Sequence, residues 1–378
     1  MQRWSVVQQE LMPELRAEVG PLTPKLEKVI HTLEWVRIEE FVESSWLGVG
    51  RPPHDRGALA SAFVAKAVLG LGTTTALIER LKVDRALRRI CGFSMWKRVP
   101  DASTFSRAFD EFAQAKLGER VHEALVREQL GEALIGHISR DGTAIEAREK
   151  PARKDKLKAA APVKRGRPRK DEVREPKLKV ITRQLSQSLA EMLGALPRVC
   201  DRGTKCNAQG YKVSWNGYKL HIDTADCGVV VSALLTSASV HDSQTAIPLG
   251  LMSAGRVTNC YDLMDAAYCS EEIRGHSRSL GHVPLIDHNP RGGEKIEFDP
   301  AEAQRYKERS QAERSNARLK DEFGGRDVWV SRLLKNAFGL QEMTESDESA
   351  YCNALISFDG EFPDSRLHVS KSRISTAC

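Results

Sequence analysis

The chain has 378 residues, of which 41% are hydrophobic and 29% are charged, and its 57 basic and 51 acidic side chains give a net charge of +6. This composition is typical of a soluble globular protein of two or three domains and argues against a fibrous or disordered chain. We expect no secretion, membrane span or structural zinc, because no secretory leader is visible, the apolar stretch 59–78 contains Lys66, and the eight cysteines lack zinc-type spacing.

Residues 1–130 are expected to form a helical domain. Leu77, Leu81 and Leu87 recur at helical spacing, and Asp101 or Ser103 can cap a helix that begins near residue 102. The apolar face of that helix is assigned to the core and consists of Phe105, Ala108, Phe109 and Phe112. Basic side chains on the polar positions either hold phosphates or form a solvated surface; these are Arg85, Arg88, Arg89, Lys97, Arg98 and Arg107.

The middle of the chain changes to strands that alternate with helices. A strand at 135–138 leads into Asp141 and is expected to turn at Gly142, and two strands within 217–242 are joined by a turn at Gly228. Helices are expected at 246–252, 271–280 and 300–323, the last capped by Asp299, and strands at 257–264 and 283–286. This order of elements predicts the α/β class, with a mixed sheet flanked by helices.

The segment 148–210 is expected to be a basic, disordered insertion or linker. Between residues 148 and 183 the sequence holds 15 basic and 5 acidic residues, several prolines and almost no aromatic side chain, so this stretch cannot bury a core of its own. Its heptad 164–170 (KRGRPRK) resembles the AT-hook, whose arginines enter the narrow minor groove of A·T-rich DNA. That resemblance implies DNA contacts by Arg165, Arg167 and Arg169, and the alternative is a solvated linker.

Three carboxylates lie at or near the ends of expected elements, namely Asp141, Asp265 and Glu313. If they converge, Mg²⁺ or Mn²⁺ would be the matching hard cation. Each carboxylate taken alone is more simply a helix cap or a surface charge, because the chain has 51 acidic residues.

The late helix 300–323 carries an unusual polar face. Tyr306, Arg309, Glu313 and Lys320 follow one another at intervals of 3, 4 and 7 residues, which places them on one side of a helix. A solvated face with an Arg309–Glu313 ion pair, worth about 0.3 kcal/mol, would explain this pattern. The alternative is a metal-binding carboxylate flanked by groups that bind phosphates.

Several sequence blocks resemble the DDE transposases of bacterial insertion sequences. The spacing Y-x2-R-x3-E-x6-K, which begins at Tyr306, is the Y-R-E-K signature of that family. Residues 139–143 (SRDGT) and 263–268 (LMDAAY) resemble its two aspartate blocks, 216–221 and 239–243 the strand pair between them, and 58–112 its N-terminal helical domain. The resemblance covers residues 50–330, with an insertion at 148–210.

The resemblance implies an RNase H-like core in which Asp141, Asp265 and Glu313 form a catalytic triad that holds two Mg²⁺ or Mn²⁺ ions. Asp262 competes for the place of the second aspartate, but Asp265 is preferred because it closes its strand and stands three residues before a tyrosine. The implied reaction cuts the element ends and joins their 3′-hydroxyls to target DNA by two-metal phosphoryl transfer. No covalent enzyme intermediate is required.

The same resemblance implies the partners and the domain plan. Tyr306, Arg309 and Lys320 would contact DNA near the element's end. The partners would be the terminal inverted repeats and target DNA, bound by a homodimer in the bacterial cytoplasm at the nucleoid, with no membrane. The expected domains are a helical DNA-binding domain at 1–130, the catalytic domain at 131–330 and an atypical, disordered tail at 331–378.

The tail departs from the family's pattern, because it becomes acidic where the family continues into an apolar helix. One hypothesis is that these residues are out of the ancestral reading frame, and the alternative is a different but folded tail. A catalytically impaired derivative that binds DNA as a repressor is therefore weighed against a working transposase. A third possibility, an RNase H-like nuclease such as a resolvase, is disfavoured by the Y-R-E-K face and the N-terminal helical domain.

Overall fold

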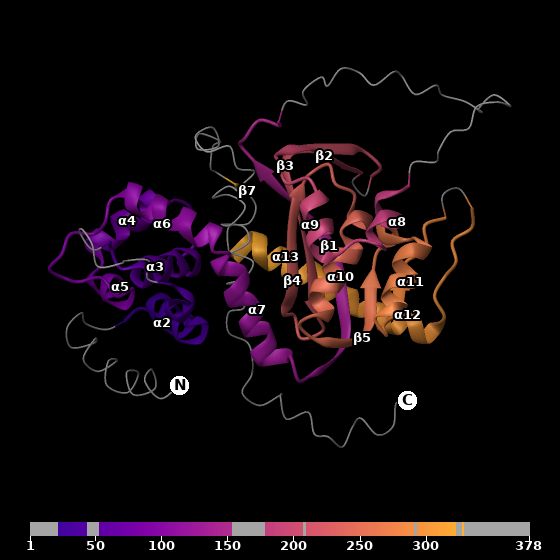
Figure 1. Cartoon of the computed structure of the whole chain (residues 1–378), viewed down its shortest axis with the longest axis horizontal. Helices are drawn as coiled ribbons and strands as arrows, with labels where there is room; N and C mark the ends of the chain where they lie inside the picture. Colours follow the sequence, from indigo (N-terminus) through magenta and orange to yellow (C-terminus); the bar gives the residue numbers. More distant parts are fainter. Residues whose placement is uncertain are drawn as a thin grey trace.

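The computed structural model describes residues 22–43, 53–152, 178–206, 209–290, 293–322 and 327–328. Figure 1 shows a helical lobe built from the first part of the chain and a larger lobe built around a sheet, with helix α7 (Leu117–Leu130) between them. No helix within the described ranges is long and apolar enough to cross a membrane. The helical N-terminal region and the mixed sheet that the sequence predicts are both present.

The helical lobe is fastened by side-chain caps and by an aromatic cluster. Thr23, Asp55 and Thr73 each accept a hydrogen bond from a backbone N–H in the first turn of the helix they precede. Phe105 is fully buried, and its ring packs edge-on against Phe63 at 5.7 Å. The lobe contains α2 (Pro24–Val36), the 3-10 turn η1 (Ile38–Phe41), α3 (Arg56–Val68), α4 (Thr74–Val83), α5 (Arg85–Ile90) and α6 (Ala102–Gln114).

Helix α7 belongs to the cores of both lobes. Leu117 and Val121, in its first turns, pack with apolar side chains of α2 and α3. Val126 and Leu130, near its end, pack with strand residues of the larger lobe. Buried His122 also binds the sheet, with its Nε2 2.8 Å from the backbone carbonyl of Val230. The two lobes are therefore joined through a shared helix.

Seven strands of the described chain form one sheet around a central strand, β1. Strand β1 is antiparallel to β3 on one side and parallel to β5 on the other, where β7 also pairs with its end. Strand β4 is antiparallel to β3, and β6 is parallel to β5, which gives the order β4-β3-β1-β5-β6 of an RNase H-like sheet, with β2 added beside β3. The strands are β1 (Leu134–Ala147), β2 (Asp201–Cys206), β3 (Lys212–Ala225), β4 (Val230–Ser237), β5 (Thr258–Met264), β6 (Val283–Ile286) and β7 (Asp327–Val328).

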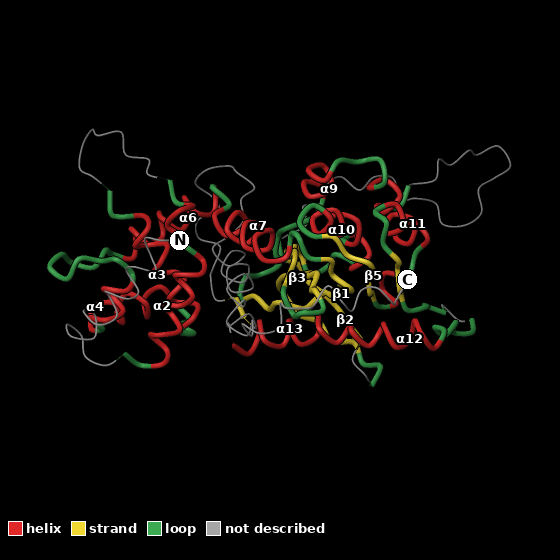
Figure 2. The backbone as a smooth tube through the Cα atoms, turned by 90° about the horizontal axis from the view of Figure 1, so that it is seen from below, coloured by secondary structure: helices red, strands yellow, loops and turns green. Residues whose placement is uncertain are grey.

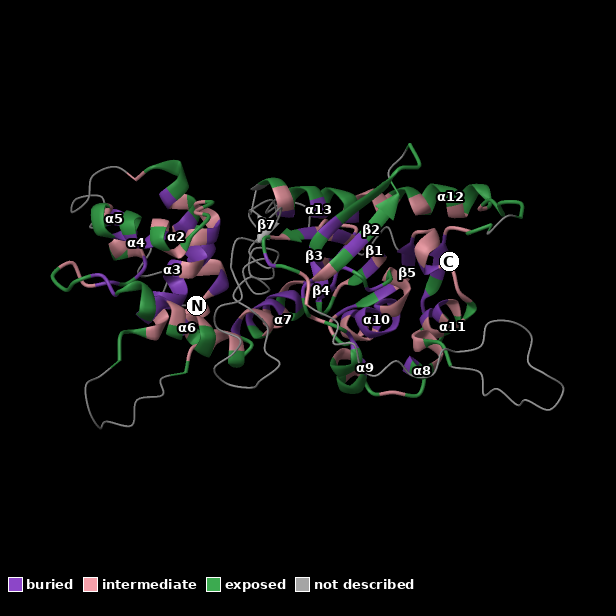
Figure 3. Cartoon of the chain, turned by 90° about the horizontal axis from the view of Figure 1, so that it is seen from above, coloured by how far each residue is buried: buried purple, intermediate pink, exposed green. Residues whose placement is uncertain are grey.

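Helices cover both faces of the sheet, as Figure 2 shows from below. One face is covered by α8 (Val180–Gln184), α9 (Leu189–Ala195), α10 (Ala246–Ala254) and α11 (Glu271–Ser279), with the short turns η2 (Asp242–Gln244) and η3 (Ala266–Tyr268) between them. The other face carries α12 (Pro300–Tyr306), η4 (Lys307–Arg309) and α13 (Ser310–Glu322). Most of α10 is buried, whereas α12 has no buried residue (Figure 3).

Several local expectations are confirmed. Asp299 accepts hydrogen bonds from two backbone N–H groups at the start of α12, and Gly228 adopts the positive φ of +85° that its turn requires. Phe105 and Ala108 are fully buried in the helical lobe. Asp101 stands at the N-cap of α6, but its side chain makes no capping hydrogen bond there.

The expected turn at Gly142 is wrong. Strand β1 runs without interruption to Ala147, and Gly142 pairs with His221 of β3. Asp141 therefore lies within a strand and not at its end. A glycine is needed at this position for a different reason, because a Cβ atom here would lie 2.7 Å from Oδ1 of Asp242. The late helix differs as well, because η4 separates α12 from α13.

The expectation of a disordered linker across 148–210 is wrong for residues 178–206. Residues 178–206 form α8, α9 and β2, and α9 begins with a capping box between Ser188 and Glu191. Leu196 packs with Leu234 and Leu249 of the core. The charge count that suggested a linker comes mainly from the residues before 178. The AT-hook-like heptad with Arg165, Arg167 and Arg169, and the tail 331–378, lie outside the described residues.

Candidate active site

Two adjacent parallel strands bring Asp141 and Asp265 together. The register of β1 and β5 pairs Arg140 with Met264. Asp141 is the next residue of β1, and Asp265 directly follows β5, so the two aspartates are neighbours across the strand pair. Because successive side chains of a strand point to opposite faces, both aspartates face α12 and α13, whereas Arg140 faces α10.

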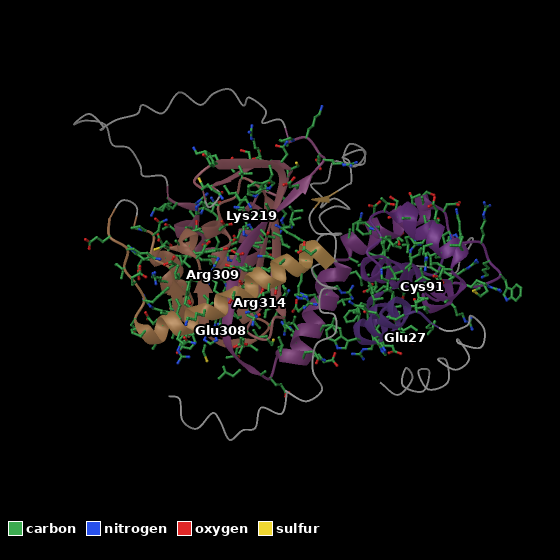
Figure 4. All side chains as sticks on the ribbon, turned by 180° about the vertical axis from the view of Figure 1, so that it is seen from behind. Glu27, Cys91, Lys219, Glu308, Arg309 and Arg314 are labelled. Carbon is green, nitrogen blue, oxygen red and sulfur yellow. The ribbon has the colours of Figure 1, made fainter. Side chains whose placement is uncertain are left out.

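The third carboxylate, Glu313, comes from the helical segment that crosses this face of the sheet (Figure 4). Two hydrogen bonds fasten the segment to the strands. The hydroxyl of Ser139 donates to the carbonyl of Glu308 at 3.1 Å, and the hydroxyl of Tyr306 donates to the carbonyl of Met264 at 3.0 Å. The turn η4 is thereby held over the middle of β1 and the end of β5, and α13 begins directly beside the two aspartates.

The guanidinium of Arg309, labelled in Figure 4, lies between all three carboxylates. Its Nη1 is 2.8 Å from Oε1 of Glu313. Its Nη2 is 3.4 Å from Oδ1 of Asp141 and 3.8 Å from Oδ2 of Asp265. Three acidic residues that are far apart in the sequence therefore converge on one cationic group.

Burial and the neighbouring charges shift the pKa values of the cluster. Burial, together with the charges of Asp265 and Asp242, raises the pKa of Asp141 to about 6, although Arg309 acts in the opposite direction. Burial also raises the pKa of Asp265. Burial alone would lower the pKa of Arg309, but the charges around it, with Asp141 first, raise it. One guanidinium thus faces three carboxylates, and its single positive charge does not balance all three of them.

The donor set fits a hard divalent cation, because it consists of carboxylate oxygens from two rigid strands and one helix. As the side chains stand, no group of three or more His, Cys, Asp or Glu residues in the described ranges is arranged to hold a metal ion. The guanidinium of Arg309 contacts all three carboxylates, through Nη1 to Glu313 and through Nη2 to the two aspartates. It acts as a stand-in cation at this place.

Asp262, the competing candidate for the second aspartate, lies on the other face of the sheet. It is almost fully buried and accepts hydrogen bonds from Asn259 at 3.0 Å and Ser277 at 2.5 Å, with His282 at 3.2 Å. Burial alone would raise the pKa of Asp262, but the hydrogen bond with His282 and the charge of Arg140 lower it. The Asp262 carboxylate is buried in the core, where Asn259, Ser277 and His282 hydrogen-bond to it, and it does not approach Arg309.

The other residues of the Y-R-E-K face have different surroundings. Burial raises the pKa of Tyr306 to about 12, and its ring packs against Phe298 at 4.8 Å. Lys320 is partly buried on α13, two turns beyond Glu313. Of these side chains, Arg309 is the one that contacts all three carboxylates.

One neighbour of the cluster was missed by the sequence analysis. Asn316 is 6% exposed, and its Nδ2 donates to Oδ2 of Asp141 at 2.9 Å. It stands three residues after Glu313, so helical spacing already places the two on one face of α13. That spacing was the available signal. Asn316 fixes the direction of the Asp141 carboxylate.

A second missed neighbour is Asp242, which approaches β1 at the position of Gly142. Its Oδ1 lies 3.1 Å from Nζ of Lys219 and 3.5 Å from Nδ1 of His221. Burial lowers the pKa of His221 to about 4, so the imidazole is neutral near pH 7. No local pattern predicts this approach, because Asp242 and Gly142 are one hundred residues apart.

A buried ion pair lies on the face of β1 opposite to Asp141. Arg140 and Asp223 are 4% and 0% exposed, and the guanidinium donates two hydrogen bonds of 2.7 Å to the carboxylate. Ser253 of α10 donates a third at 2.6 Å. Because Arg140 is the residue before Asp141, this pair holds β1 beside β3 at the place where the active carboxylate emerges.

Comparison with known proteins gives two family matches. The model of a transposase domain (DUF772) matches residues 14–111, and the model of the transposase DDE domain matches residues 137–340. The first match spans most of the helical lobe, and the second spans the sheet, the three carboxylates and the helix that carries Glu313. No curated protein and no solved structure matches the chain.

Proposed function

Since the chain belongs to the transposase DDE domain family, whose model matches more than half of its residues, we propose that it cuts the two ends of an insertion sequence and joins the freed 3′-hydroxyls to target DNA. The observation that carries this proposal is the convergence of Asp141, Asp265 and Glu313 on one guanidinium. Family membership makes the chain a DNA transposase, and the cutting and joining steps are what the site's chemistry supports.

The carboxylates of Asp141, Asp265 and Glu313 would hold the divalent ions, Mg²⁺ or Mn²⁺. Bound there, a pair of such ions would help to deprotonate the attacking water or 3′-hydroxyl and would stabilise the leaving oxygen. The chain supplies the rigidity, because Asp141 and Asp265 are fixed by paired strands and Asn316 orients one of them. Burial is the first cause of the raised pKa of Asp141, and the charges of Asp265 and Asp242 add to it.

Arg309 has two roles in this proposal. Its guanidinium contacts the three carboxylates and would balance part of their charge. Its long side chain can turn to a DNA phosphate once that charge is neutralised otherwise, and it then serves the DNA contact that the Y-R-E-K signature implies. Further DNA contacts are proposed for Tyr306 and Lys320 on the same face, for Arg165, Arg167 and Arg169 of the basic segment, and for a second copy of the chain at the other element end.

The test is cleavage of the DNA that adjoins the gene on both sides. We expect Asp141→Asn, Asp265→Asn and Glu313→Gln each to abolish Mg²⁺-dependent end cleavage and joining while DNA binding remains. Asp321→Asn, an exposed carboxylate further along α13, is the matched control and should cleave normally. Retained nicking in any of the three variants removes that residue from the triad. Binding without cleavage by the unaltered chain would instead favour the alternative, a catalytically impaired derivative that binds DNA.

A further inference from the structure

The loop between α5 and α6 exposes a tryptophan almost completely to water. Trp96 is 94% exposed, the highest value among the large hydrophobic side chains of the described residues, and Lys97 and Arg98 beside it are exposed as well. Phe93 and Val99 are buried and anchor the loop on both sides of this tip. Burying an aromatic side chain of this size gives a large gain in free energy, so its exposure leaves an unused binding surface.

The conformation of this loop is fixed by hydrogen bonds. Arg88 of α5 donates from Nε and Nη2 to the carbonyl of Ser94, at 3.1 and 2.8 Å, and Nη2 also reaches the carbonyl of Lys97. The backbone N–H of Trp96 donates to the hydroxyl of Ser94 at 3.3 Å. One guanidinium thus closes the loop across its tip. A partner that binds Trp96 therefore meets a loop that is already ordered, which lowers the entropic cost of binding.

The surface around the tip is strongly basic. From residue 79 to residue 101 the sequence holds seven basic and three acidic residues. One of the acidic residues, Asp84, forms an ion pair with Arg80 at 2.8 Å and accepts a hydrogen bond from the backbone N–H of Leu87 at 2.9 Å. The exposed basic side chains of this stretch include Lys82, Arg85, Arg89, Lys97 and Arg98. The matching ligand is a polyanion that also offers flat apolar surfaces.

We propose that the loop 91–101 docks on duplex DNA, with Trp96 stacking on a base or inserting at a base step while Lys97 and Arg98 meet the neighbouring phosphates. DNA combines planar apolar faces with closely spaced negative charges, as this surface requires. The loop forms the end of the helical lobe that lies farthest from the sheet (Figure 1), so the contact anchors DNA away from the triad. The inference rests on the proposed function, because it supplies a DNA contact for a chain that cuts DNA.

The test measures binding of the full chain to a duplex of the DNA that adjoins the gene, with metal chelated so that cleavage does not interfere. Trp96→Ala should weaken binding by about 5- to 140-fold, which is 1–3 kcal/mol at 1.4 kcal/mol per tenfold change. The slope of log affinity against log salt should not change, because stacking releases no counterions. Lys97→Ala and Arg98→Ala should each lower the magnitude of that slope by about 0.9.

Two controls make the result specific. Trp96→Phe should retain more affinity than Trp96→Ala, because it keeps an aromatic face. Tyr211→Ala removes another exposed aromatic side chain, 72% exposed, before β3, and should leave affinity unchanged. Since Trp96 is almost fully exposed, its replacement should leave the thermal unfolding midpoint unchanged.

Three outcomes would overturn the inference. If the unaltered chain cleaves element ends and Trp96→Ala binds the duplex as tightly as it does, this inference is overturned while the proposed function stands. If the unaltered chain binds no duplex DNA, both are overturned. If Trp96→Ala changes the sedimentation of the DNA-free chain but not its DNA affinity, the loop joins protein copies and the inference is again overturned.

Discussion

The buried pair of Arg140 and Asp223 gives a prediction whose size follows from the structure. Arg140→Met would leave the Asp223 carboxylate, which is 0% exposed, with the hydroxyl of Ser253 as its remaining side-chain hydrogen-bond donor. Removing one partner of a buried ion pair costs about 3–5 kcal/mol, because an uncompensated charge remains in the core. For a lobe of this size that loss corresponds to a fall of about 6–20 °C in the unfolding midpoint.

The double variant separates this effect from a simple loss of contacts. Arg140→Met combined with Asp223→Leu removes both charges, and we expect it to be more stable than either single variant. Urea unfolding, followed by far-UV circular dichroism and by the fluorescence of the six tryptophans, measures the free energy of unfolding of each protein.

An exposed ion pair supplies the control. Arg278 and Glu271 are 59% and 79% exposed at 3.1 Å, so Arg278→Met should cost at most a few tenths of a kcal/mol, roughly the value of a surface pair. If Arg140→Met costs no more than this control, or if the two single effects simply add in the double variant, the assigned role of the buried pair is wrong.

Two further predictions concern Asn316 and His122. Asn316→Ala should raise the Mg²⁺ concentration for half-maximal cleavage by about 10- to 100-fold, because the Asp141 carboxylate loses its 2.9 Å donor; a lower unfolding midpoint at an unchanged Mg²⁺ requirement would show a structural role alone. Burial and the charge of Arg256 lower the pKa of His122 to about 3, whereas the pKa of an unfolded histidine is about 6.5. Between about pH 6.5 and pH 3, His122 therefore binds one more proton in the unfolded chain than in the folded chain. The free energy of unfolding then falls by up to about 1.4 kcal/mol for each unit by which the pH is lowered. His122→Gln should flatten this decline in urea unfolding measured across the same range, and parallel curves for both proteins would contradict the assignment.

Local patterns in the sequence were enough for most elements. The cap at Asp299, the apolar stripe around Phe105 and the turn at Gly228 depend on residues within a few positions of one another, and all three are present in the structure. The order of strands and helices also indicated a mixed sheet, which the structure confirms. The triad was proposed from strand ends and helical spacing, and from the resemblance to a family.

Features that depend on distant partners were misjudged or missed. Gly142 suggested a turn, but the glycine is needed because Asp242 packs against an uninterrupted strand. The same limit hid Asn316, whose partner Asp141 is on another element. A composition count over the basic segment likewise concealed α9, which packs through Leu193, together with Leu196 just after it, against residues of β4 and α10.

The sequence by itself determined which residues carry charge, where the helices and strands occur and which family the chain resembles, because these depend on side-chain chemistry and short-range spacing. The tertiary structure alone decided that Asp141, Asp265 and Glu313 share one guanidinium and that Asp262 faces the other side of the sheet. The physical reason is the register of two parallel strands and the path of a helix across them, which no local sequence pattern encodes.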